Sequence, residues 1–451
     1  MAKLWDKGTP LNELVARFTV GRDWVLDRDL LVADCAGSVA HVRGLVAATL
    51  LAPEVGERLE ASLRAIAAEA RAGRVAIRRE DEDGHTTIEM LLTERLGDAG
   101  RMVHTGRSRN DQVLTATRLW TREALLAIGE SALELIDVLV TRAEQESATV
   151  MPGRTHLQHA MLSTFGLWLA AVAEHLIDDV RVLATAADLN DRSPLGSAAA
   201  YGTPLPVDRE FLATQMGFPA VHNNVLAAGQ SRGLTEMRIA EALAGVCLTL
   251  GRMAGDLLLF ALPEVGYIGV PAELCTGSSI MPQKQNPDAL ELLRGRAAVV
   301  DGWAAQIRGV VRDLPSGYNR DLQDTKEPLM RAVAATEEGL AVARLLIERL
   351  EVRRDAMRRA LTPELFATDF AYELVAAGVP FREAYRRAAI GYADRPVPDA
   401  DVALAARTAI GSPGNLNLDV PRRAAAHLRE EFGPARGAHE AAVLRTCSGQ
   451  T

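Results

Sequence analysis

Two stretches of the chain carry apolar residues at alternating spacings of three and four, which is the pattern of one face of an α-helix. Both stretches also follow the seven-residue repeat of helices that pack lengthwise against one another. The pattern predicts two long helices in a bundle. Their apolar faces could be buried within one subunit or shared between subunits, and the spacing alone favours neither. The two sets are Leu125, Ile128, Ala132, Leu135 and Leu139, and Leu243, Val246, Leu250, Met253, Leu257 and Phe260.

Proline spacing supports the same interpretation. No proline lies between residues 53 and 152, 219 and 263, or 287 and 315. An interior proline costs a helix ~3 kcal/mol, so each of these segments can hold long helices. Strand patterns are weak, and a short strand is expected near residues 265–270. The sequence therefore predicts a mainly all-α fold.

The chain has 451 residues, which is too many for one ordinary hydrophobic core. Polar segments rich in Gly, Ser, Thr and Pro separate the predicted helices, and such loops are where binding and catalysis tend to occur. We expect an N-terminal helical domain at residues 1–108, a central long-helix bundle at 109–352, and a small C-terminal helical domain at 353–451.

Composition and charge exclude several classes of protein. Apolar residues make up 48% of the chain and charged residues 24%, as in a globular protein. The net charge of −9, without a Lys/Arg block, argues against a nucleic-acid partner. The first ten residues lack the apolar run of a signal peptide, and no stretch has the ~18 consecutive apolar residues of a membrane span. We expect a cytoplasmic protein without a membrane partner.

Cysteine usage points the same way. The four cysteines are far apart and form no CxxC pair, which argues against a zinc cage or a disulfide framework. This spacing fits a reducing compartment. The four are Cys35, Cys247, Cys275 and Cys447.

The loop at residues 275–288 is the first candidate for chemistry. Asn286 and Pro287 precede an acidic residue, an arrangement that predicts a helix start with Asn as the cap and Pro at the first helical position. Ser279 and Lys284 then lie on a loop that leads to a helix N-terminus, where free N–H groups favour anions. A solvated polar turn is the commoner explanation for a loop of this composition.

A second polar segment, residues 104–111, also leads into a predicted long helix. Arg107, Arg109 and Asn110 could bind a carboxylate or a phosphate. Alternatively, one arginine pairs with Asp111 on the surface, a contact worth ~0–1 kcal/mol. The GxxxxGK[ST] pattern of a P-loop is absent.

A third segment, residues 155–159, is predicted to open a helical stretch. His156 and His159 would then share a face as metal ligands, but no nearby Glu or Cys completes a set and HExxH is absent. An acid/base histidine is better supported, because the ordinary pKa of ~6.5 lies near working pH. A structural histidine with satisfied hydrogen bonds is about as well supported by this segment alone.

These segments together resemble the fumarase/aspartase superfamily. GSSIMPQKQNPD (277–288) resembles its signature GSSxMPxKxNP, and HTGRSRNDQV (104–113) and PGRTHLQ (152–158) resemble the two other blocks of its active site. Within the superfamily, the first of these two blocks and YNRDLQDTKEPL (318–329) resemble the argininosuccinate lyase family.

The resemblance implies an activity and an assembly. The expected reaction is the reversible β-elimination of argininosuccinate, a small molecule whose succinyl moiety is a dicarboxylate, to arginine and fumarate in arginine biosynthesis, without a cofactor or metal. The expected assembly is a homotetramer whose central helices form one bundle. Each active site would take one block from each of three subunits. The resemblance thus favours intersubunit sharing of the two apolar seams.

The resemblance also implies roles for individual residues. Ser279 matches the base that removes the Cβ proton, and a dianion then forms on the neighbouring carboxylate, with Lys284 as a donor that stabilises it. His156 is the candidate acid for the departing nitrogen, oriented by Glu291. The implied substrate contacts are Ser38, Asp83, Arg109, Asn110, Thr155, Asn286, Tyr318, Gln323 and Lys326.

The sequence departs from the family pattern at several positions. Residues 159–162 read His-Ala-Met-Leu where the family has x-A-Q-P, Gln285 replaces a second lysine, and Tyr385–Arg386 replaces two histidines. These differences motivate an alternative, a related C–N lyase that releases fumarate from another N-substituted succinate. A third hypothesis is a non-catalytic structural homologue, against which the intact Ser279 and His156 argue.

Overall fold

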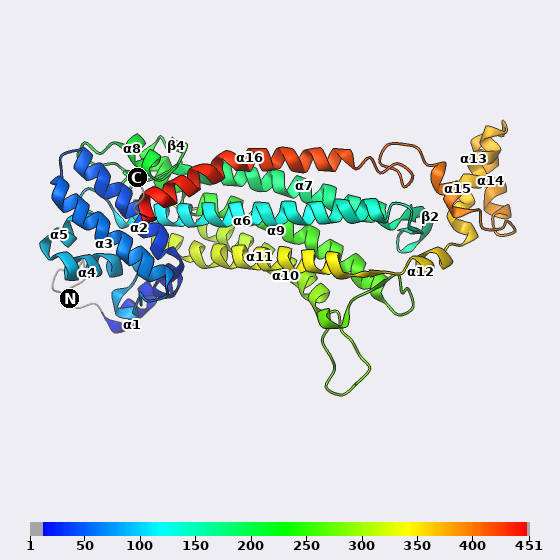
Figure 1. Cartoon of the computed structure of the whole chain (residues 1–451), viewed down its shortest axis with the longest axis horizontal. Helices are drawn as coiled ribbons and strands as arrows, with labels where there is room; N and C mark the ends of the chain where they lie inside the picture. The colour runs from blue at the N-terminus through cyan, green and yellow to red at the C-terminus, as the bar shows by residue number, and fades with distance from the viewer. Residues whose placement is uncertain (1–11, 449–451) are drawn as a thin grey trace.

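The computed structural model describes residues 12–448. A bundle of long helices runs along most of an elongated molecule (Figure 1). Helices from the first part of the chain form one end, and a small group of short helices lies beyond the opposite end. The first ten residues, on which the expectation of no signal peptide rests, lie outside the described residues.

Helices make up most of the described chain, which confirms the predicted all-α fold. The α-helices are α1 (Glu13–Val20), α2 (Asp23–Ala47), α3 (Pro53–Arg71), α4 (Gly84–Leu96), α5 (Asp98–Arg101), α6 (Arg109–Gln145), α7 (Phe165–Asn190), α8 (Arg209–Gln215), α9 (Val225–Ala261), α10 (Asp288–Val311), α11 (Lys326–Arg349), α12 (Arg354–Arg359), α13 (Ala367–Ala376), α14 (Phe381–Gly391), α15 (Ala400–Ala405) and α16 (Asp419–Val443).

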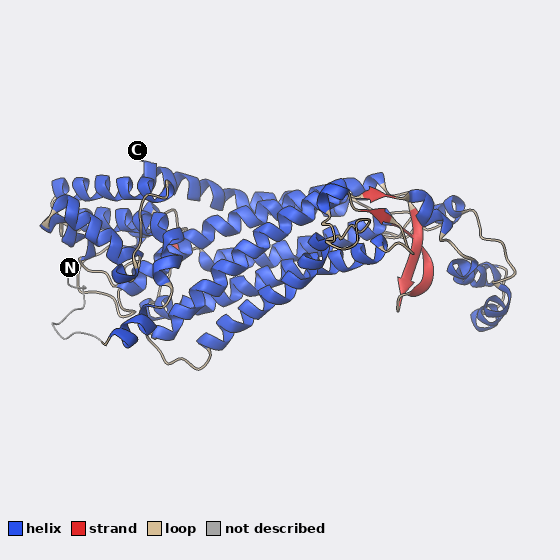
Figure 2. Ribbon diagram, turned by 90° about the horizontal axis from the view of Figure 1, so that it is seen from below, coloured by secondary structure: helices blue, strands red, loops and turns tan. Residues whose placement is uncertain are grey.

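The strands are short, and the most prominent pair is the antiparallel hairpin β1–β2 near one end of the bundle (Figure 2). One strand lies where the sequence predicts it, near residues 265–270. The strands are β1 (Val150–Thr155), β2 (Gln158–Thr164), β3 (Arg192–Ser193), β4 (Ala220–Val221), β5 (Ile268–Gly269) and β6 (Glu351–Val352).

The two predicted apolar seams lie in the middle of the bundle, on α6 and α9. Every seam residue is at most 8% exposed within the single chain, because α6 packs on α7 and α11, and α9 packs on α7, α10 and α11. Burial of one such side chain contributes about 1.5–3 kcal/mol. The expectation that these seams are shared between subunits is therefore wrong, since they have no surface left to offer. Exposed apolar side chains lie elsewhere on the bundle, among them Val182, Leu248 and Leu292.

The N-terminal unit is built from α2, α3 and α4. Pro53 is the first residue of α3, where its missing N–H costs nothing. Leu59, Leu63 and Ile66 of α3 are fully buried and contribute to a core of their own between these helices. Helix α2 also packs on α6, and this contact holds the N-terminal unit against the end of the bundle.

The last described helix returns along the bundle. Helix α16 packs on α6 and α7, and the segment after it contacts α2 and α3 (Figure 1). Arg43 and Arg64 both donate to the carbonyl of Arg445, at 3.2 and 2.6 Å. The range 353–451 thus includes the short helices α12–α15 beyond the bundle and a long helix within it. The domain boundaries near residues 108 and 352 stay predictions.

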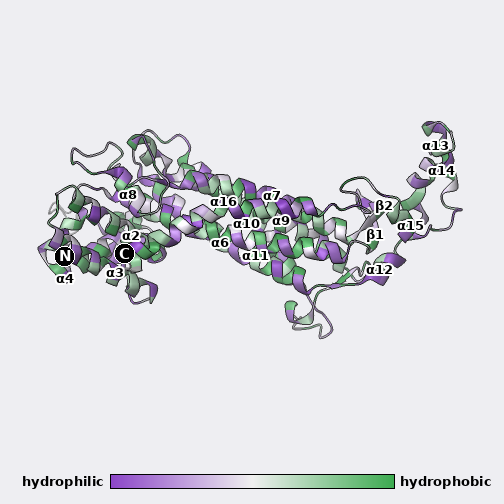
Figure 3. Cartoon of the chain, turned by 45° about the horizontal axis from the view of Figure 1, so that its top comes forward, coloured by the Kyte–Doolittle hydropathy of each residue, from purple (hydrophilic) through white to green (hydrophobic). Residues whose placement is uncertain are grey.

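Two helices, α2 and α9, are long and apolar enough to span a membrane by length and composition alone. Both pass through the interior of the fold, and both bury charged side chains, such as Asp27 and Asp34 in α2 and Glu236 in α9. Hydrophilic and hydrophobic residues alternate along the bundle helices (Figure 3). This is the pattern of core helices in a helical bundle.

Candidate active site

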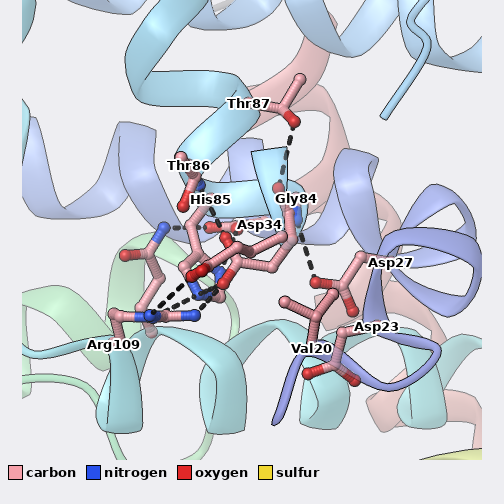
Figure 4. Close-up of polar contacts among 12 residues, drawn as sticks. Val20, Asp23, Asp27, Asp34, Gly84, His85, Thr86, Thr87 and Arg109 are labelled. Carbon is pink, nitrogen blue, oxygen red and sulfur yellow. Dashed lines mark hydrogen bonds and ion pairs between the residues drawn. The ribbon is translucent and has the colours of Figure 1, made fainter. Parts of the chain in front are cut away.

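Arg109 and His85 lie side by side where α4 and α6 begin (Figure 4), and Asp83 contacts both. Asp83 caps α4 by accepting a hydrogen bond from the Thr86 N–H at 2.9 Å. Arg109, the first residue of α6, donates to the Asp83 carboxylate and, through Nε, to His85 Nε2 at 3.1 Å. Two helix N-termini therefore meet beside one arginine, and side chains of the chain itself already accept from several of their N–H groups, at Gly84, Thr86 and Asn110.

Asp34 of α2 completes this cluster. Its Oδ1 accepts a hydrogen bond from Gln112 at 2.7 Å, and its Oδ2 lies 3.6 Å from His85 Nδ1. Burial alone would raise the pKa of Asp34, but the hydrogen bond and charge of His85 and the charge of Arg107 lower it. The carboxylate thus stays ionised and fixes the imidazole of His85.

Arg107 and Ser38 form a buried contact behind the cluster. Arg107 donates to the Ser38 hydroxyl at 2.9 Å, so the hydroxyl is engaged within the protein. Asp111 is not the surface partner of either arginine. It is buried, and its carboxylate accepts backbone N–H groups of Ser108, Gly196 and Ala198 at 2.8–3.1 Å, while burial raises its pKa to about 6.

Lys326, the first residue of α11, is also buried. It donates to Asp23 at 2.9 Å and to Asp27 at 2.6 Å. The second oxygen of Asp27 accepts the Gly84 N–H at 2.9 Å, so this carboxylate joins α2, α4 and α11. In the short helix η4 (Arg320–Thr325), Gln323 donates to the Val20 carbonyl at 3.1 Å. Gln323 and Lys326, two of the predicted substrate contacts, are thus both bound to residues of α1 and α2.

Tyr318 and Asn110 lie at the same end of the bundle as the cluster around Arg109. Tyr318 is partly exposed, and the Arg232 guanidinium lies 5.5 Å from its ring centroid. Arg232 and Gly233 have non-helical backbone angles that kink α9, and Gly233 has a φ of +81°. A Cβ there would lie 2.3 Å from Val311, so the kink requires glycine. Asn110 is the second residue of α6.

Thr155 and His156 lie on the β1–β2 hairpin, so the predicted helix at residues 155–159 is wrong. Thr155 pairs with Gln158, which leaves His156 and Leu157 as a two-residue turn with φ of +53° and +62°. Such turns require positive φ at both positions and usually contain Asn-Gly. For other residues the left-handed conformation costs roughly 1–2 kcal/mol each, so this turn is strained. His156 is exposed at its tip.

Ser279 and Lys284 lie on an exposed loop that projects from the bundle between β5 and α10 (Figure 1). Reciprocal backbone hydrogen bonds between Thr276 and Asn286, at 2.9 and 3.0 Å, close its base. The helix start is one residue later than predicted, since Pro287 occupies the capping position and α10 begins at Asp288. Asn286 does not cap the helix. Its side chain donates instead to the Gly277 carbonyl at 3.2 Å.

Three groups of candidate residues are separated in a single chain: the cluster around Arg109, the turn that bears His156, and the loop that bears Ser279. Helix α6 has 37 residues and is therefore ~55 Å long, and it separates Arg109 at its start from the hairpin that follows it. Helix α10 has 24 residues, ~36 Å, and separates the Ser279 loop from Tyr318. Within residues 12–448, no hydrogen bond or ion pair joins His156 to Glu291, which is exposed in the first turn of α10. Their predicted pairing is not made within one chain.

Sequence reasoning missed two carboxylates of the cluster, Asp27 and Asp34. The signal was present, because Asp23, Asp27 and Asp34 are spaced by four and seven residues and share one face of a helix rich in apolar residues. Charged residues aligned in this way on a buried helix indicate a polar network. Among residues 12–448, no group of three His, Cys, Asp or Glu is positioned for a metal ion.

The cavities do not coincide with all of these residues. A cavity of about 1020 Å³ lies between α6, α7 and α16, away from the three groups. A cavity of about 370 Å³ adjoins the cluster and is lined by Gln323, Asp23 and Glu327, among others. Neither of these two cavities is lined by residues of all three groups.

Comparison with known proteins identifies the family. The sequence profile of a family described as lyase matches residues 13–302. The chain is 47% identical to an argininosuccinate lyase of Sorangium cellulosum over 431 residues, covering 95% of this chain and 99% of the relative. The chain belongs to the argininosuccinate lyase family. An argininosuccinate lyase of Stenotrophomonas maltophilia is 43% identical, with 92% and 97% covered. One of Thermotoga neapolitana is 40% identical, with 86% and 98% covered.

Solved structures support the lyase fold. An EDDS lyase variant with bound fumarate has a TM-score of 0.81 at 21% sequence identity and covers 98% of this chain and 95% of that one. A class II fumarase from Schistosoma mansoni has a TM-score of 0.73 at 16% identity, with 94% and 97% covered. At this identity the likeness describes the fold alone. This member of the argininosuccinate lyase family thus has the long-helix architecture predicted from its sequence.

Proposed function

We propose that the protein cleaves argininosuccinate to arginine and fumarate by β-elimination, in arginine biosynthesis. The observation that carries the proposal is the 47% identity, over nearly the whole chain, to a relative named argininosuccinate lyase. The presence of Ser279, Lys284 and His156 in the matching motifs supports an active enzyme rather than a structural homologue.

The proposed chemistry assigns a role to each group. Ser279 removes a proton from the Cβ of the succinyl moiety, and the electron pair delocalises into the neighbouring carboxylate as a dianion. Lys284 and Asn286 stabilise that charge. The C–N bond then breaks, its electron pair leaves with the guanidino nitrogen, and His156 supplies the proton to that nitrogen. Closure of the Ser279 loop excludes water, and donors on the loop stabilise the serine alkoxide.

We further propose that the protein is a homotetramer with active sites shared between subunits. The separation of the three groups along the bundle supports this, as do the exposed Leu248 and Leu292 on bundle helices. Sedimentation measures the assembly. A mixed-subunit experiment tests the sharing, in which Ser279→Ala and His156→Asn tetramers are dissociated and reassembled together. Recovered activity supports shared sites, and a mixture as inactive as its parents contradicts them.

The direct test of the activity is absorbance at the fumarate band with argininosuccinate as substrate. The parent protein should form fumarate, and a tetrameric Ser279→Ala variant should lose at least about a hundredfold in rate. No fumarate from an intact parent tetramer would contradict the proposal.

A cytoplasmic location is also proposed, supported by the four free cysteines, and cell fractionation tests it.

A second candidate substrate is a different N-substituted succinate. The observation that favours it is the sequence at 159–162, where Met161 is exposed on the hairpin that carries His156, together with Gln285 in place of a lysine. A panel of N-substituted succinates, compared by kcat/KM, distinguishes the two. A higher value for any panel member than for argininosuccinate would favour the second candidate.

A further inference from the structure

The strained turn that carries His156 is held by its neighbours on the hairpin. Arg154 donates through Nη1 to the Leu157 carbonyl at 3.0 Å, which fixes the turn from one side. The same guanidinium contacts His159 Nε2 through Nη2 at 3.2 Å. Conformations of this kind persist where surrounding contacts determine them, and such sites are often functional.

A bulge in the hairpin creates this pairing. Pro152 pairs with Leu162, and a regular register would place residue 154 opposite residue 160. The register shifts between Pro152 and Arg154, so that Arg154 lies opposite His159 instead. Bulges redirect side chains in this way and are common beside active sites.

His159 extends the contact to another part of the chain. Its Nδ1 lies 3.2 Å from Oε1 of Glu364, which is within the short helix η5 (Pro363–Phe366). The same nitrogen lies 3.1 Å from the hydroxyl of Thr362, which precedes that helix. Because Arg154 donates to Nε2, the ring proton lies on Nδ1 and points to Glu364. Hydrogen bonds from its own backbone N–H and from Thr362 lower the pKa of Glu364, so this carboxylate is an ionised acceptor.

We propose that Arg154, His159 and Glu364 form a strut that orients the turn bearing His156, and that the three are positioning residues for the protonation of the leaving nitrogen. The inference rests on the proposed function, in which His156 is the acid. The strut runs from the turn, across the hairpin, to η5. Arg154 is exposed, and the His159 and Glu364 side chains are 24% and 43% exposed; ion pairs that are open to solvent contribute little to global stability. Their effect is therefore on the geometry of the turn.

Steady-state kinetics of the tetramer test the strut. Arg154→Ala should lower kcat about 10- to 100-fold with KM changed less than about twofold, because a misplacement of about 1 Å is costly in rate. Arg154→Lys should recover part of the loss, since an ammonium group can make one of the two contacts. Glu364→Gln, which keeps an acceptor, should have a milder effect than Glu364→Ala. The matched control is Arg387→Ala, which removes an exposed arginine paired with Glu383 on α14.

Two further measurements separate positioning from other roles. The pH profile of kcat in Arg154→Ala should keep both limbs at their parental positions. The amides of residues 155–158 should exchange hydrogen at least about tenfold faster than in the parent, and this measurement needs no activity. Unchanged exchange, an unchanged kcat, or a lost pH limb would overturn the strut. A parent protein inactive on argininosuccinate would overturn the proposed function, while hydrogen exchange would still decide the strut.

Discussion

The buried contact between Asp27 and Lys326 makes a sharp prediction for Asp27→Asn. The carboxylate accepts the Lys326 ammonium at 2.6 Å with one oxygen and the Gly84 N–H at 2.9 Å with the other. An asparagine has one oxygen and two N–H donors. It can therefore satisfy only one of the two donors and must turn its own N–H groups toward the other.

The size of the stability loss depends on the partner that Lys326 keeps in the variant. Removing one partner of a buried ion pair costs about 3–5 kcal/mol, because the remaining charge is left without compensation. Lys326 keeps Asp23 at 2.9 Å, so the lower figure, about 3 kcal/mol in the free energy of unfolding, is expected. Removing both charges together, in Asp27→Asn with Lys326→Met, should recover most of that stability. The double variant should not recover activity, since Lys326 is a predicted substrate contact.

The assay is urea unfolding followed by circular dichroism at one protein concentration, because assembly links stability to concentration. The control is Glu69→Gln, which breaks a partly exposed pair with Arg95 at 2.7 Å and should cost at most about 1 kcal/mol. A midpoint for Asp27→Asn equal to that of the control would refute the reasoning. So would a double variant less stable than either single one.

Three other predictions concern pH, the hairpin and the bundle. Asp111 has a folded pKa of about 6, above its ordinary value of 3.8, so its contribution to stability is complete below about pH 4 and is lost as pH rises through about 6. Urea unfolding between pH 4 and 7 should show this decline in the parent but not in Asp111→Asn, and equal slopes would contradict it. Gly153→Ala should reduce kcat, because the new Cβ would lie 2.8 Å from a backbone carbonyl of β2. The control, Gly255→Ala, adds a Cβ in open space on α9 and should be neutral or stabilising by up to about 1 kcal/mol. Equal kcat values for the two variants would count against the clash. Leu135→Ala should lower the free energy of unfolding by about 2–5 kcal/mol without changing the sedimenting mass, whereas Leu292→Asp should reduce that mass. Dissociation by Leu135→Ala alone would contradict the intrasubunit seam.

The long helices were predictable because proline-free segments with a three- and four-residue apolar period leave few alternatives. Whether the apolar seams are buried within one subunit or between subunits was not predictable. Their spacing is the same whether the facing helix belongs to the same subunit or to another, and only burial in the structure separates the two. The capping of α6 by Ser108 and Asp111 follows from local sequence, whereas the buried partners of Asp111 come from residues 196 and 198, far along the chain.

The hairpin at residues 150–164 shows another limit of sequence reasoning. A two-residue turn with positive φ is usually marked by Asn-Gly, but here the residues are His156 and Leu157, whose left-handed conformation has no local signal. For the site, motif resemblance supplied the residues, whereas the buried carboxylates of α2 were missed although their spacing carried a signal. The distances between the three groups depend on helix length and assembly, which no motif contains.

The return of α16 to the N-terminal unit has a consequence for biosynthesis. Helices α2 and α3 leave the ribosome long before α16, yet Arg43 and Arg64 donate hydrogen bonds to a carbonyl near the end of the described chain. During translation, these two guanidinium groups stay hydrated until Arg445 has emerged, 402 residues after Arg43 and 381 after Arg64. The early helices can collapse on their own core, but their native surroundings are completed last. A nascent chain that stalls before Arg445 therefore leaves this side of the N-terminal unit exposed to chaperones and proteases, and the contact forms only after that residue is made.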